Sequence, residues 1–217
     1  MTEQDIRGEA GRRADQAIEL TGFELISLLS LGDDASSRKT RESLRLPEVP
    51  EGSPLLGAGL SSLIVRKMAT VDDAGVLTPQ GKVLALTAVL NRATEWIEAA
   101  GVSGETNHVG LLVKSPDGAA LIEPKPYGIW QALPVPAGEP LIDVATRYVR
   151  ATYQDIKSLP FAGSVKVIGL EGDRAAAVRI AEDKSWEISS GPAEQLPRPV
   201  PVEADPSFAL LAKAVAA

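Results

Sequence analysis

Apolar side chains recur every three or four residues through much of the first 100 positions, and every second residue in the strand-like segments that follow. Spacing of three to four predicts amphipathic helices, whereas alternation predicts strands with one buried face. The helices predicted in this way span residues 21–31, 54–68, 78–100, 140–157 and 207–216. The predicted strands span residues 109–114, 119–123, 127–133, 165–170, 174–180 and 185–189. Between the first two helices, residues 33–53 are expected to form a short helix or loop that leads into an extended linker.

The predicted helices carry recognisable start and stop signals. Thr21 and Glu24 have the spacing of a capping box, in which each side chain accepts a hydrogen bond from the other residue's backbone amide. Pro54 suits the first position of a helix, where no backbone N–H is needed. The segment between the second and third helices, residues 71–77, is expected to be a tight turn between two short extended pieces.

The two strand regions resemble each other. A shift of 56 residues aligns residues 109–136 with 165–192 without a gap, and six pairs are then identical, including Trp130 with Trp186. The chain has three tryptophans in all, so this pair argues for an internal repeat. The alternative is two unrelated meanders of similar composition.

The fold class that follows is α+β. We expect two pseudo-symmetric halves that share one antiparallel sheet, with helices packed on it and an N-terminal winged-helix-like helical portion. Joining the two meanders edge to edge would protect strands that are otherwise open to aggregation. The expected domain organisation is a flexible N-terminus over residues 1–17, a first half over 18–136 and a second half over 137–217.

The alternation of side chains also predicts a candidate surface. It places both tryptophans of the repeat on the side of the sheet that carries the helices. Tyr127, Ile129 and Leu133 then lie on the opposite face, which is unusually apolar for a face open to solvent. Either another element covers this face or it is a docking surface for a partner.

Composition narrows the classes of function. The chain has no cysteine and one histidine, which excludes disulfide scaffolds, zinc fingers and thiol chemistry. The formal net charge of −7 opposes general attraction to nucleic acid, so we do not expect nucleic-acid binding. No apolar run is long enough for a membrane span, and the polar start has no signal-peptide pattern, so we expect a cytoplasmic protein.

Catalytic, metal and cofactor patterns are weak. His108 has Ser103 and Glu105 nearby, but their order matches no known catalytic arrangement, and a hydrogen-bonded histidine at a strand edge is the simpler interpretation. The acidic pairs 33–34 and 72–73 fit turns and helix caps better than metal sites. Residues 75–82 differ from a phosphate-binding loop in spacing and in the hydroxyl position. We therefore predict no catalytic residue, no metal ligand and no cofactor.

The order of elements resembles the EspG family of type VII secretion in actinobacteria. The resemblance includes a capped leucine-rich helix, a helix that ends in the run Leu63–Met68, an acidic turn, Leu77-Thr78-Pro79, a long helix and a three-stranded meander with a glycine-containing hairpin at 117–118. It covers roughly residues 20–190. The resemblance implies a quasi-symmetric α/β fold and a non-enzymatic role as a cytosolic chaperone that binds a secreted helical substrate.

The resulting hypothesis is a non-enzymatic, protein-binding module whose partner is a helical protein. Residues Tyr127, Ile129 and Leu133 are the predicted contact residues. One alternative is a winged-helix DNA-binding regulator formed by residues 54–86, although only Arg66 and Lys67 would face the phosphates. Another is an enzyme without a recognisable motif.

Overall fold

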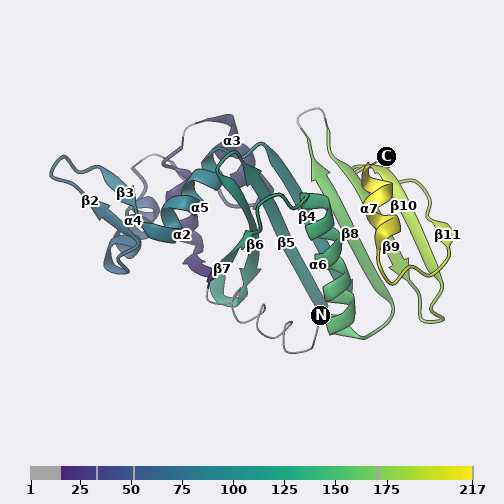
Figure 1. Cartoon of the computed structure of the whole chain (residues 1–217). Helices are drawn as coiled ribbons and strands as arrows, with labels where there is room; N and C mark the ends of the chain where they lie inside the picture. Colours follow the sequence, from purple (N-terminus) through teal and green to yellow (C-terminus); the bar gives the residue numbers. More distant parts are fainter. Residues whose placement is uncertain (1–15, 33, 51, 170–171, 217) are drawn as a thin grey trace. The chain divides into compact units, whose positions relative to one another are not determined.

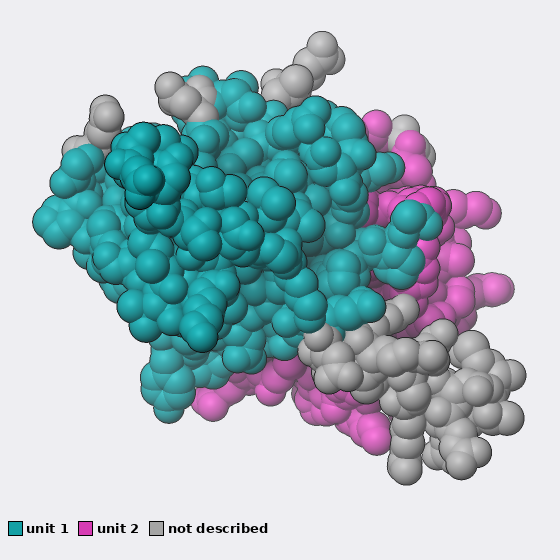
Figure 2. All heavy atoms as spheres, turned by 60° about the vertical axis from the view of Figure 1, so that its left-hand side comes forward, with its two compact units in different colours: residues 1–94, 113–137 teal, residues 95–112, 138–217 magenta. Residues whose placement is uncertain are grey.

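The computed structural model describes residues 16–32, 34–50, 52–169 and 172–216 (Figure 1). The predicted flexible N-terminus, residues 1–17, lies almost wholly outside the described residues. The described chain forms two compact units. The first contains the residues up to Thr94 together with Val113–Ala137, and the second contains Glu95–Leu112 together with the residues from Gly138 onward (Figure 2). Residues 95–112 thus cluster with the second unit although they precede Val113–Ala137 of the first unit in the sequence.

In its described residues, the first unit combines four α-helices with a small hairpin and the strands of one sheet region. Its helices are α2 (Gly22–Leu29), α3 (Ala35–Ser43), α4 (Pro54–Val65) and α5 (Gly81–Asn91). Its strands are β1 (Ile18–Thr21), β6 (Gly118–Lys125) and β7 (Ile129–Val135), with a separate two-stranded sheet of β2 (Ala69–Val71) and β3 (Leu77–Pro79). The predicted turn between short extended pieces is this β2–β3 hairpin.

In its described residues, the second unit places two α-helices against one face of its strands. The helices are α6 (Leu141–Ile156) and α7 (Ala209–Ala216), and the strands are β4 (Glu95–Ser103), β8 (Phe161–Ile168), β9 (Arg174–Ile180), β10 (Trp186–Pro192) and β11 (Val200–Val202). β5 (Thr106–Ser115) has residues in both units. Aromatic side chains lie between these helices and the strands. The rings of Tyr153, Phe161, Trp186 and Phe208 form a cluster of mutual contacts.

Nine strands of the described chain form one antiparallel sheet, as predicted for the fold class. Their order is β1-β7-β6-β5-β4-β8-β9-β10-β11 (Figure 1). The edge strands β1 and β11 have only four and three residues. They were not predicted, because a strand this short gives almost no alternation to detect.

The helix predicted over residues 78–100 is too long: the observed helix begins later and ends earlier. Leu77–Pro79 is strand β3, helix α5 runs from Gly81 to Asn91, and residues 95–103 form β4. The adjacent side chains of Trp96 and Ile97 are both buried, at 5% and 1% exposure. A strand that is buried on both faces shows no alternation, so its apolar residues continued the helical spacing of α5 without a visible break.

The two hairpins that the sequence repeat relates are paired in the same register. Ala119 lies opposite Val135 in β6–β7, and Ala175 lies opposite Gly191 in β9–β10. Ala119 and Ala175 are 56 residues apart in the sequence, and so are Val135 and Gly191. The environments of the two related tryptophans differ, however. Trp186 is buried among the aromatic rings of the second unit, whereas Trp130 is half-buried beside Gly22.

Candidate protein-binding surface

The β6–β7 hairpin has one face against helices and one face without them. On the first face, Ala120, Ile122 and Ala132 are at most 4% exposed, and the helices α5 and α2 contact this hairpin. The other face carries Ala119, Leu121, Ile129, Leu133 and Val135, all half-buried. We call these five residues the open face. It is apolar although no helix in the described part of the first unit covers it.

Two of the three predicted contact residues belong to the open face. Ile129 and Leu133 lie on the face opposite Trp130, as the alternation predicted. Tyr127 does not belong to the strand, because Pro126–Gly128 form a short 3-10 turn before β7 begins. Its backbone is left-handed, with φ of 65°, and its side chain is fully exposed. Tyr127 therefore lies beside the open face at the end of the hairpin.

A polar cross-strand pair, Glu123 and Gln131, lies on the same face between Ile129 and the other four residues of the open face and forms their border. Glu123 lies opposite Gln131, and its carboxylate accepts from the Lys125 ammonium at 3.4 Å. The apolar pairs Leu121–Leu133 and Ala119–Val135 continue away from this border. Cross-strand pairs of this kind have Cβ atoms roughly 5 Å apart, so their side chains form one continuous apolar strip.

The outer edge of the sheet beside this surface is closed by an arginine. β1 pairs with β7 on one side, and on its outer side Nη2 of Arg66 donates to the carbonyl oxygen of Glu19 at 2.9 Å. The opposite edge strand, β11, contains Pro201, which has no backbone N–H to donate. Each of these edge strands therefore has one position at which an added strand could not pair.

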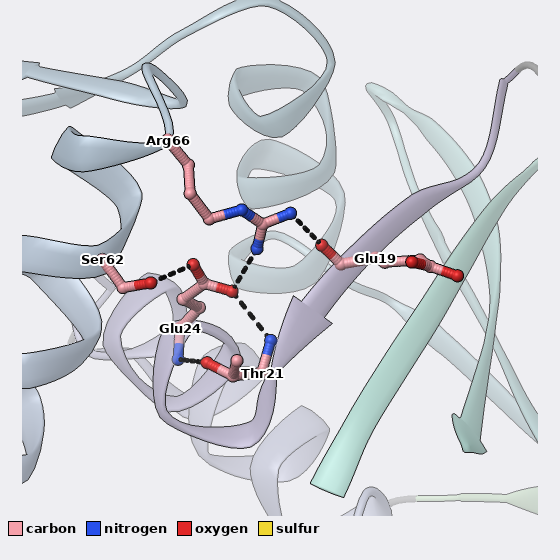
Figure 3. A network of polar contacts seen from close by, with 5 residues as sticks. All are labelled: Glu19, Thr21, Glu24, Ser62 and Arg66. Carbon is pink, nitrogen blue, oxygen red and sulfur yellow. Dashed lines mark hydrogen bonds and ion pairs between the residues drawn. The ribbon is translucent and has the colours of Figure 1, made fainter. Parts of the chain in front are cut away.

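Arg66 is held in place by a buried carboxylate, Glu24 (Figure 3). The side chain of Glu24 has no exposure, and its Oε2 accepts from Nη1 of Arg66 and from the amide of Thr21, both at 2.7 Å. Its Oε1 accepts from Oγ of Ser62 at 2.7 Å. The predicted capping box of Thr21 and Glu24 is confirmed. The same carboxylate also connects α2 with α4, which sequence reasoning missed; the only available signal was that Ser62 and Arg66 are four residues apart on one helix.

The pKa of Glu24 is below its ordinary value. Burial acts in the opposite direction and raises it, but the hydrogen bonds from Ser62, Thr21 and Arg66, with the charge of Arg66, outweigh burial. The carboxylate is therefore ionised at neutral pH.

Helices α2 and α4 approach closely at a glycine. A Cβ atom at Gly59 would lie 2.2 Å from Oγ of Ser27 and 2.3 Å from the carbonyl oxygen of Phe23. Beside this contact, Oγ of Ser27 donates to the carbonyl oxygen of Leu56 at 3.1 Å. α4 is thus fixed to α2 by small residues and polar contacts, and it orients Arg66 toward β1.

The remaining surface of α4 is a second apolar patch. Val65 is 80% exposed, and Leu55, Ile64 and the nearby Phe23 of α2 are each more than one-third exposed. The sequence analysis did not assign a surface role to these residues. Within α4, only Gly59 and Leu63 are fully buried.

The described residues contain neither a cluster that could hold a metal ion nor a helix that could span a membrane. His108 is exposed on β5. Within residues 16–32, 34–50, 52–169 and 172–216, no group of three or more histidine and acidic side chains lies close enough together to hold a metal ion. In the same part of the chain, no helix has the length and hydropathy to cross a membrane.

The fold is similar to that of a known secretion chaperone. No family model and no curated protein matches the chain. Among solved structures, it is similar to the type VII secretion system chaperone EspG5 of Mycobacterium tuberculosis, which was solved in complex with the PE25–PPE41 dimer. The alignment covers 92% of this chain and 95% of EspG5, with a TM-score of 0.56 and 11% sequence identity. The predicted resemblance to EspG proteins is thereby confirmed at the level of the fold.

Proposed function

We propose that this protein is a non-enzymatic, cytosolic chaperone of type VII secretion that binds a helical substrate through the open face. The observation that carries the proposal is the similarity to EspG5 over almost the whole of both chains, since that protein was solved with a bound protein dimer. Fold similarity alone does not transfer a function. The apolar, uncovered open face supplies the site that such a function needs.

The blocked positions at the two edges favour binding on the face of the sheet. A partner that added a strand would need free backbone groups at β1 or β11, where Arg66 and Pro201 stand. A helix satisfies its own backbone hydrogen bonds and can bury an apolar stripe on a sheet. Tyr127, at the end of the hairpin, extends the proposed contact beyond Ile129 and Leu133.

The pseudo-symmetric arrangement is part of the proposal. We take the hairpins β6–β7 and β9–β10 as copies of one ancestral meander. Their equal registers and the six identical pairs support this origin. The different surroundings of Trp130 and Trp186 would then reflect later divergence of the copies.

The alternative of DNA binding has less support. Of the two cations available to a winged helix, Arg66 is bound to Glu24 and to the carbonyl of Glu19. Asp72, in the hairpin that would be the wing, adds a negative charge that phosphates repel. A gel-shift assay at about 100 mM salt tests this alternative directly, because phosphate contacts dominate such binding.

Replacing Ile129 with aspartate is expected to abolish partner binding without unfolding the chain. A carboxylate on the open face would have to lose its water in the complex, and this costs several kcal/mol, roughly a thousandfold or more in affinity. The measurement is co-purification from the native host, read by mass spectrometry, with circular dichroism to check the fold.

The matched control is Val65→Asp, which places the same charge on the second apolar patch, where Val65 is 80% exposed. It should leave co-purification unchanged. Binding that survives Ile129→Asp and is lost with Val65→Asp would move the site to α4. If the wild-type chain recovers no helical secreted protein, the chaperone function itself is wrong.

A further inference from the structure

Helices α6 and α7 border a pocket in the second unit. Both helices contact β8, and they also contact each other (Figure 1). The pocket has a volume of about 310 Å³. The side chains that determine its chemistry come from one side of each helix: Asp143, Thr146, Arg147 and Arg150 of α6, and Ala212 and Lys213 of α7. None of these residues belongs to the first unit, which carries the open face.

The helical repeat of α6 explains why two arginines line the pocket together. The buried stripe of this helix contains Leu141, Ala145 and Val149, all at most 1% exposed. The pocket residues of α6 form a neighbouring row, because they also follow one another at helical spacing. Arg147 and Arg150 are three positions apart in that row, so their side chains lie on the same side of the helix.

Two of the basic groups in the pocket have no counter-ion in the described part of the chain. Nη2 of Arg147 donates to the Glu139 carboxylate at 2.7 Å. Arg150 is half-buried and Lys213 is exposed, and neither forms an ion pair or a side-chain hydrogen bond with any described residue. A guanidinium group has five N–H donors in a planar fork. Those of Arg150 are therefore available to a ligand in the pocket.

The acidic groups around the pocket leave an excess of positive charge. Glu139 accepts from Arg147, and Asp205 accepts from the amide of Leu210 at 2.8 Å as α7 begins. Asp143 lies in the first turn of α6, where its charge suits the helix dipole. Of the described residues that line the pocket, Asp143 alone is acidic, against three basic side chains. This local excess is opposite in sign to the net charge of −7 of the whole chain.

We propose that this pocket binds a small phosphate-bearing anion, either the free ion or a phosphate monoester, through Arg150 and Lys213. Arg147, held by Glu139, adds a third positive charge beside them. The guanidinium fork matches two phosphate oxygens, and the ammonium group acts as a compact point charge. An ion with a charge near −2 neutralises the excess of the lining, whereas a single carboxylate would neutralise half of it. The volume is at the lower end for ligand pockets, so the ligand is small.

The proposed anion would connect the two helices. Arg150 belongs to α6 and Lys213 to α7, so an anion held by both adds a polar contact to the apolar packing of α7. A helix of eight residues gains from such a contact, because short helices depend on tertiary interactions. This inference does not depend on the proposed chaperone function, and either can fail without the other.

The first test compares inorganic phosphate with chloride. Thermal unfolding of the full chain is followed by circular dichroism in about 10 mM phosphate and in sodium chloride of the same ionic strength, because salt alone screens charges. For a dissociation constant of about 1 mM, phosphate should raise the unfolding midpoint by about 3–5 °C. Isothermal titration calorimetry should give a single site per chain. Equal midpoints in the two salts, without heat of binding, would overturn the proposal.

Substitutions locate the site. Arg150→Met removes the guanidinium and keeps an apolar stem, so phosphate should bind at least about tenfold more weakly. Arg150→Lys keeps the charge without the fork, and its affinity should lie between those of Arg150→Met and the wild type. The matched control is Arg198→Met, because Arg198 is exposed and does not line the pocket. Its affinity should equal that of the wild type. The midpoint of each variant in chloride shows that it is folded.

Two outcomes of this series would contradict the site. If Arg150→Met binds phosphate as tightly as the wild type, the anion does not occupy this pocket. If Arg198→Met loses as much affinity as Arg150→Met, phosphate responds to the net charge of the chain and not to a site. Methyl phosphate distinguishes the two sources of the ligand: a monoester site binds it at least as tightly as inorganic phosphate, whereas a site for the free ion binds it more weakly.

Amide hydrogen exchange tests the connection between the helices. Phosphate should slow exchange in α7 of the wild type, because opening of this helix would then require release of the anion. In Lys213→Met the same concentration of phosphate should leave exchange in α7 unchanged. Exchange that is slowed equally in both proteins would show that Lys213 does not hold the anion, and would overturn the proposed contact between α6 and α7.

Discussion

Replacing Gly59 with valine is expected to reduce the free energy of unfolding by about 4 kcal/mol or more, enough to leave a marginally stable protein largely unfolded. The new side chain would meet the carbonyl oxygen of Phe23 at 2.3 Å and Oγ of Ser27 at 2.2 Å. The first of these atoms belongs to the backbone of α2 and cannot rotate away. The helices would have to separate, and the hydrogen bond from Ser27 to Leu56 would be lost with the close packing.

The control for this substitution lies in the same helix. At Gly57 no atom approaches within 4 Å of the added Cβ position. Gly57→Ala should therefore stabilise the protein by about 0.5–1 kcal/mol, through the higher helix propensity of alanine. Urea unfolding followed by circular dichroism measures both variants. A Gly59→Val variant within about 1 kcal/mol of the wild type would show that α2 and α4 are not closely packed in solution.

The contrast between these two glycines illustrates what the sequence could and could not predict. Both weaken α4 by the same intrinsic amount, so from the sequence they are equivalent. The capping box at Thr21, the start of α4 at Pro54 and the extent of α6 follow from local rules and are confirmed within one or two residues. The close approach at Gly59 depends on where α2 lies, and no local pattern records that.

The strands were predictable where one face is buried and the other is not. β9 has the predicted bounds, and Ile129 and Leu133 lie on the predicted side of β7. β4 was missed because it is buried on both faces, and Tyr127 was misplaced because Pro126 and Gly128 bend the chain into a turn before β7. For the candidate site, the sequence could predict its apolar residues. It could not predict that Arg66 closes the neighbouring edge, since this depends on a contact between residues 47 positions apart.

Replacing Glu24 with alanine is expected to lower the free energy of unfolding by about 3–5 kcal/mol at neutral pH. The carboxylate accepts three hydrogen bonds without any exposure, so its removal leaves Ser62, the amide of Thr21 and one side of Arg66 without an acceptor. The exposed ion pair between Arg92 and Asp117 provides a control, because solvent screens it. Asp117→Asn should cost no more than about 1 kcal/mol. Similar losses for the two variants would show that the Glu24 network does not stabilise the contact between α2 and α4.

The same carboxylate predicts how stability changes in acid. Because the pKa of Glu24 is lower in the folded chain than in the unfolded chain, its contribution is fully present above the unfolded value, near pH 4.3. It is lost as the pH falls through the folded pKa, where the carboxylate takes up a proton. Glu24→Gln should thus be less stable than the wild type at pH 7, and the difference should shrink as the pH is lowered below about 4. Urea unfolding of both proteins across this range measures the effect. A difference that stays constant with pH would mean that the ionised state of Glu24 contributes nothing, and that the position of Arg66 at the sheet edge depends on packing alone.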